Sequence, residues 1–108
     1  MALIDMDFVN GGGKGCKVYI DTANYSAVSG NNTRTFDGFT KIRTATIYNY
    51  NTASNIQIQY SVAVLNDDDT LTVVSDYPST VNITSISGNS VTFYTTQTTS
   101  TRIAIAGE

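Results

Sequence analysis

The sequence predicts an all-β protein, and three observations support this fold class. Thr, Ser and Asn are abundant, with seventeen, ten and ten copies in 108 residues. Thr, Tyr, Val and Ile favour strands, whereas Asn, Gly, Asp and Ser favour turns. Apolar and polar residues alternate in short segments separated by such turn residues, and helix formers are scarce, with one Glu and three Leu. We expect a single-domain antiparallel β-sandwich of eight or nine strands, with a small barrel as the alternative.

The N-terminal segment alternates apolar and acidic residues and predicts a short strand, with Ile4, Met6 and Phe8 on one face. Four glycines then fall within residues 11–15, a composition typical of a joint or of a loop with positive φ values. A strand beyond such a joint can pair with its own sheet or with a neighbour's. The sequence therefore suggests an arm whose apolar side chains contact other subunits, or simply the first strand of the domain.

The predicted domain organisation follows from this boundary: an N-terminal strand or arm with a Gly-rich joint at 1–15, and the sandwich domain at 16–108. Within the domain, strands are expected at 16–21 and 33–36, and Asp37-Gly38 marks a tight turn.

Residues 41–75 predict a three-stranded meander with strands at 41–50, 55–65 and 70–75. In the expected register, Tyr48 lies opposite Ile56 and Ile42 opposite Val62, which places the apolar set from Ile56 to Val64 on the buried face. At the second turn, Val64 is expected opposite Leu71 and Val62 opposite Val73.

Pro78 is the only proline, and it marks a corner where the chain changes sheets. Two strands at 81–86 and 91–96 flank the hairpin turn 87–90, which predicts Ile86 opposite Val91 and Ile83 opposite Tyr94. The last strand, 101–106, places Ile103 and Ile105 on one face.

Composition excludes several function classes. There is no His, which removes the commonest general base and metal ligand, and no catalytic, cofactor-binding or metal-binding motif stands out. We therefore expect a protein that is not an enzyme. The net charge of −3, without a basic cluster, argues against a nucleic-acid partner, and no apolar run predicts a membrane span. The lone Cys16 is expected to be structural. Without a recognisable signal peptide, synthesis in the cytoplasm is expected.

Two groups of residues suggest binding. Asn66 to Asp69 place three carboxylates in one turn, which predicts a solvated turn or, as the alternative, weak calcium binding. Tyrosine rings stack on sugars and amides bond their hydroxyls, so the group at the end of the meander's first strand suggests a carbohydrate site: Tyr48, Asn49, Tyr50 and Asn51.

The run ITSISGNSVTF at 83–93, followed by a Thr-rich turn and the ending IAIAGE, resembles the closing hairpins of small bacteriophage or prophage virion proteins. Many of these are short, Thr/Ser/Asn-rich β modules of tails, fibres or capsid decorations, and the N-terminal arm is similar to arms that they lend to neighbouring subunits. The resemblance implies a structural module of a phage-like particle that forms homo-oligomers or docks on other virion proteins. The alternative is a carbohydrate-binding module, such as one at a tail-fibre tip.

Overall fold

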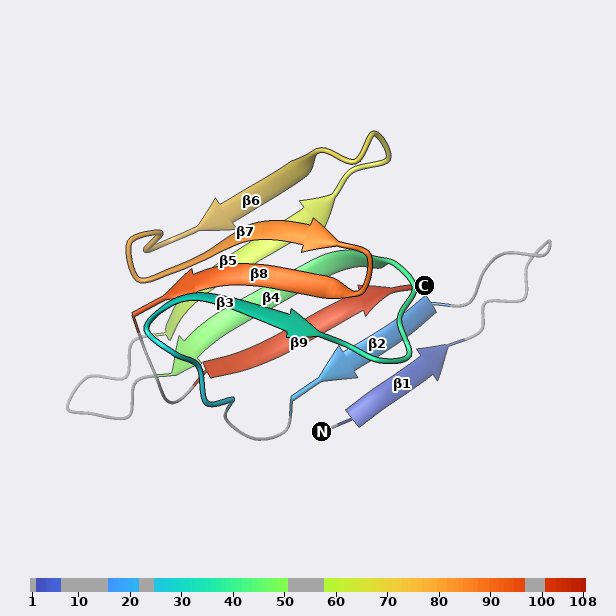
Figure 1. The fold of residues 1–108 in the computed structure, drawn as a ribbon, viewed down its shortest axis with the longest axis horizontal. Coiled ribbons are helices and arrows are strands. Elements are labelled where there is room, and N and C mark those ends of the chain that lie inside the picture. Colours follow the sequence, from blue (N-terminus) through green and yellow to red (C-terminus); the bar gives the residue numbers. More distant parts are fainter. Residues whose placement is uncertain (1, 7–15, 22–24, 51–57, 97–100) are drawn as a thin grey trace.

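The computed structural model describes residues 2–6, 16–21, 25–50, 58–96 and 101–108, with the backbone alone at 2–6, 50 and 58. The described residues form no helix and nine strands in two antiparallel sheets, so the predicted all-β sandwich is confirmed (Figure 1). The strands are β1 (Ala2–Met6), β2 (Cys16–Ile20), β3 (Gly30–Thr35), β4 (Ile42–Tyr50), β5 (Ile58–Leu65), β6 (Leu71–Ser75), β7 (Val81–Ser87), β8 (Ser90–Thr95) and β9 (Thr101–Gly107).

The larger sheet has the order β1-β2-β9-β4-β5-β6, and the smaller has the order β3-β8-β7. Figure 1 shows the smaller sheet lying across the middle of the larger one, with β1 and β6 at the two edges of the larger sheet. The predicted pairing of neighbouring strands in the meander β4-β5-β6 and in the hairpin β7-β8 is confirmed. Pro78 lies between β6 and β7, where the chain crosses from one sheet to the other, which confirms the predicted corner.

The core lies between the two sheets. The large sheet contributes mainly β4, β5 and β9, and the small sheet contributes β7 and β8. Ile103 and Ile105 of β9 are both buried, as their spacing predicts. The other buried apolar side chains on these five strands are Ile42, Ala45, Ile47, Ala63, Leu65, Val81, Ile83, Ile86, Val91 and Phe93.

The predicted register of the first hairpin of the meander is wrong by four residues. Tyr48 lies opposite Tyr60, not Ile56, and Val62 lies opposite Thr46, not Ile42. Because the shift is an even number of residues, the residues predicted to share a face still share it. However, the structure buries the other face of the hairpin.

Small side chains explain which face of β5 is buried. Ala63 and Ser61 are fully buried, whereas Tyr60 and Val64 are exposed. The small residues let β7 approach closely, and the Ser61 hydroxyl accepts a hydrogen bond of 2.9 Å from the backbone N–H of Ile83. Sequence periodicity favours burial of the more apolar face of β5. The second sheet can approach closely only over the face with the smaller side chains, so that face is buried.

Two other predicted registers change because of local irregularities. Between β5 and β6 the connection is one residue longer than expected, with Asp69 at φ 65°, so Val62 pairs with Val74 and Val73 turns inward. Between β7 and β8, the pairing of Ile86 with Val91 is confirmed.

A register shift between Ile83 and Ser85 then places Ile83 opposite Phe93, not Tyr94 as predicted. This bulge turns both Ile83 and Phe93 into the core. Strand β3 also differs from the prediction, since it begins at Gly30. The Asn32 side chain accepts from the N–H of Val28 and donates to its carbonyl, which closes the preceding turn.

Candidate functional site

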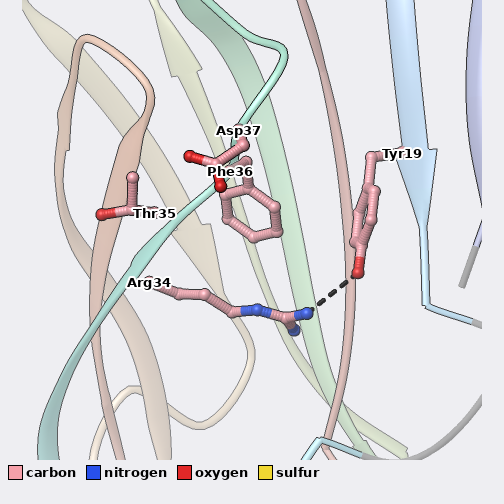
Figure 2. Close-up of a pocket in the computed structure, with 5 residues that line it drawn as sticks. All are labelled: Tyr19, Arg34, Thr35, Phe36 and Asp37. Carbon is pink, nitrogen blue, oxygen red and sulfur yellow. Dashed lines mark hydrogen bonds between the residues drawn. The ribbon is translucent and has the colours of Figure 1, made fainter.

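The most organised polar cluster lies between β2 and β3 and is built around Arg34 (Figure 2). Its guanidinium donates to Asp21 Oδ2 at 2.6 Å, to Asp21 Oδ1 at 3.2 Å and to the Tyr19 hydroxyl at 2.9 Å. The Tyr19 hydroxyl in turn donates to Asp21 Oδ1 at 2.8 Å. Strand alternation explains the arrangement, because residues 19 and 21 point to the same side of the chain.

Aromatic rings surround the Arg34 guanidinium. Its Cζ atom lies 4.5 Å from the centroid of the Tyr25 ring, 5.0 Å from that of Phe36 and 5.6 Å from that of Tyr19. Tyr19 and Phe36 also contact each other edge to face, with ring centroids 5.1 Å apart. Contacts between a cation and ring faces add to the attraction of the ion pair with Asp21.

Burial and charge shift the ionisation of this cluster. Burial, together with the hydrogen bond donated to Asp21, raises the pKa of Tyr19. Burial opposes the charge of Arg34, but hydrogen bonding and attraction to Asp21 outweigh it, so the pKa of Arg34 is raised. Both groups therefore keep their protons at neutral pH, and the charges of Arg34 and Asp21 balance within the cluster.

A cavity of about 230 Å³ adjoins the cluster and is lined by Tyr19, Arg34, Thr35, Phe36 and Asp37 (Figure 2). Since Arg34 already donates to Asp21 and Tyr19, the cluster is best explained as a connection between the two sheets. No sequence motif singles out Arg34, which is one of six basic residues spread along the chain. The one sequence feature that could have indicated the cluster is the spacing of two between Tyr19 and Asp21 at the end of the predicted strand 16–21.

The structure places the predicted assembly contacts at one edge of the large sheet. Ile4 lies opposite Val18 and Met6 opposite Cys16 in the antiparallel pairing of β1 with β2. Phe8 lies outside the described residues. The hypothesis that these residues contact other subunits stays a prediction.

The structure separates the first two residues of the predicted carbohydrate group. Tyr48 is half-buried on the outer face of the large sheet, opposite Tyr60. Asn49 points into the core with 2% of its surface exposed, where its amide donates to Thr95 and accepts from Thr101. Tyr50 ends β4 and is described by its backbone alone, while Asn51 lies outside the described residues. Adjacent strand residues point to opposite faces, so Tyr48 and Asn49 do not share one surface.

The acidic turn is organised by hydrogen bonds of its own. Asp68 Oδ1 accepts from the Thr70 hydroxyl at 2.6 Å and from the Thr70 N–H at 3.1 Å, and these bonds lower the pKa of Asp68. Asp69 pairs with Lys41 at 3.1 Å. Within the described residues, no group of three or more His, Cys, Asp or Glu side chains is arranged to hold a metal ion.

No helix in the described part of the chain is long and apolar enough to cross a membrane. No family model matches the sequence, and searches of curated proteins and of solved structures found no match either.

Proposed function

We propose that this chain is a non-enzymatic structural module of a phage-like particle, and that it acts by self-assembly or by docking on other subunits. Support for the particle comes from the resemblance of residues 83–108 and the overall composition to small virion proteins. Support for the mode of action comes from the position of the N-terminal strand β1 at the edge of the larger sheet. This is the main observation behind the proposal.

Strand β1 is attached to the domain through a single neighbour. Among the described strands it contacts β2 and no other, with five paired residues. Figure 1 shows it beyond the edge of the smaller sheet. Nine residues, 7–15, separate it from β2, whereas hairpin connections usually have about two to five.

These features favour exchange of β1 between copies. A β1 strand from a neighbouring copy can form the same ladder of hydrogen bonds with β2, so few contacts are lost when the strands exchange. A connection of nine residues is long enough for this exchange, since nine extended residues span roughly 30 Å. In this proposal, β1 of one subunit completes the sheet of the next.

The pairing of Met6 with Cys16 offers a direct test on the full chain. Directly opposed residues in an antiparallel pair have Cα atoms about 4.5–5.5 Å apart, which suits a disulfide. In the Met6→Cys variant under mild oxidation, we expect covalent dimers or larger species, with the peptide containing residue 6 linked to Cys16 of another copy. A non-reducing gel and mass spectrometry measure this outcome.

The wild-type chain controls for bonds between two Cys16 residues. The Ile4→Cys variant is a matched control, because Ile4 lies opposite Val18 and its thiol faces no cysteine. An oxidised Met6→Cys protein that stays entirely monomeric, with both thiols consumed, would show that β1 pairs within its own chain and would contradict exchange.

Carbohydrate binding is the second candidate, because Tyr48 and Tyr60 are direct cross-strand partners on the outer face of the large sheet. Neighbouring rings on a flat sheet suit stacking against sugar rings. On a glycan panel, we expect Tyr48→Ala and Tyr60→Ala to lose any retention. Tyr94→Ala, on the outer face of the smaller sheet, should keep it. Equal retention by all three variants would contradict a site at this tyrosine pair.

A further inference from the structure

The two outer faces of the sandwich differ in chemistry. On the smaller sheet, hydroxyl groups pair across the strands. Thr33 contacts Thr92 at 3.0 Å and Thr35 contacts Ser90 at 2.9 Å, each pair joined by a hydrogen bond between side-chain oxygens. This face therefore presents polar groups to water, as expected of the outer face of an antiparallel sheet.

The middle of the outer face of the larger sheet carries uncharged and mostly apolar side chains instead. The strand registers align its side chains in two rows that run across β2, β9, β4, β5 and β6. We call these two rows the valine face: Val18, Ala106, Thr44, Val64 and Thr72 in one, and Ile20, Ala104, Thr46, Val62 and Val74 in the other.

Three large side chains of the valine face are openly exposed: Ile20 at 42%, Val64 at 42% and Val74 at 59%. Exposed apolar residues that occur singly are ordinary, but a contiguous apolar surface on one face marks an interaction site. Resting on the self-assembly proposed above, we infer that the valine face is the contact between two copies of this chain, packed face to face.

The absence of charge on the valine face favours a second copy of this chain as its binding partner. None of its ten residues is ionisable, and the charged Arg102 lies on the neighbouring row, opposite Tyr48. When a face meets its own copy across a two-fold axis, every charge near that axis meets a like charge, so an uncharged face is suited to self-association. It offers no charge to attract an acidic or basic partner.

The shape of the valine face also complements itself. Its central strands β9 and β4 carry Ala and Thr, whereas β5 and β6 carry Val62, Val64 and Val74. A two-fold axis along β4, the middle strand of the five, would set β5 of each copy over β9 of the other and β6 over β2. Val62 and Val64 of each copy then lie over the small Ala104 and Ala106 of its partner, as in the packing of two aligned sheets.

The area is sufficient for a weak dimer. Five strands about 4.8 Å apart, over the roughly 14 Å of strand length that two rows occupy, give about 340 Å² per copy, or about 700 Å² for the pair. This is smaller than stable specific interfaces, so we expect a weak, transient dimer whose population depends on protein concentration.

The test compares the full-length chain with three point variants by light scattering and sedimentation velocity over a range of concentrations. Val64→Glu and Val74→Lys each place a charge on the valine face, and Thr33→Glu places one on the outer face of the smaller sheet. We expect the wild type and Thr33→Glu to dimerise alike. The two valine variants should dissociate at concentrations at least tenfold higher than the wild type does, or remain monomeric.

Thermal unfolding of each variant checks that it is folded. If Val64→Glu fails to fold, Val74→Lys decides, because Val74 lies on an edge strand and is 59% exposed. Oligomers that persist in the valine variants, or a wild-type chain that is monomeric throughout, would overturn the inference. The Met6→Cys disulfide reports on β1 independently, so loss of the valine contact and loss of strand exchange give different results.

Discussion

Gly107 is a position at which the large sheet leaves no room for a side chain. A Cβ atom added there would overlap the carbonyl oxygen of Lys41 and lie 2.8 Å from the Cα of Ile42. That carbonyl accepts a 2.8 Å hydrogen bond from the N–H of Glu108, so it cannot move away without breaking the pairing of the chain end. The close approach of two backbones therefore requires glycine at this position.

We predict that Gly107→Ala lowers the free energy of unfolding by about 2–3 kcal/mol, within the range for inserting a methyl group into packed structure. Replacing glycine in a strand usually stabilises by restricting the unfolded chain, so the sign itself tests the argument. Urea unfolding measures the change, with Ala106→Ser as the control because Ala106 lies on the half-exposed outer side. A Gly107→Ala protein as stable as the wild type would refute the backbone contact.

At the scale of elements, the Arg34 cluster connects β3 of one sheet to β2 of the other, and its stability depends on the proton of Tyr19. The pKa of Tyr19 is raised above its ordinary value of 10.0 by burial and by its hydrogen bond to Asp21. Folding therefore favours the protonated form. The stabilisation is fully present below pH 10, and it is lost as the pH rises through the pKa of the folded state.

We predict that the wild type loses stability above pH 10 more steeply than Tyr19→Phe does. The Phe variant keeps the ring beside Phe36 but has no hydroxyl to ionise. At pH 7 the variant should be less stable by about 1.5–3 kcal/mol, as expected for a lost hydrogen bond to a charged group. Unfolding by urea between pH 8 and pH 11 measures both effects, and the comparison isolates Tyr19 because the two proteins differ only in its hydroxyl group. Parallel pH curves would contradict the role of Tyr19.

The registers show where sequence patterns succeed and fail for individual elements. Pairing next to the tight turn at Gly88, where φ is 57°, follows the prediction, because a two-residue turn fixes the first partners. Registers further from a turn, or after a longer connection, differ by one to four residues. The alternation of apolar and polar residues indicates which residues share a face, but it does not predict a bulge such as that between Ile83 and Ser85.

At the scale of the whole molecule, the two sheets bury one face each and leave two chemically different outer faces. The polar outer face of the smaller sheet needs no partner, whereas the valine face and the edge strand β1 both offer surfaces for assembly. Their proposed roles are compatible, since face-to-face packing uses the broad surface of the sheet and strand exchange uses its edge. Together they would link subunits in two directions.

The sequence by itself determined the all-β class, most strand positions, the meander, the C-terminal hairpin and the corner at Pro78, because these depend on alternation and turn residues close together in the chain. Tertiary structure decided the rest. Whether the Ala45 and Ala63 side or the Val62 and Val64 side of the meander is buried depends on how closely β7 can approach. The contacts of Arg34 with Asp21, and the alignment of the valine face across five strands, likewise join residues far apart in sequence, and no local pattern encodes such long-range contacts.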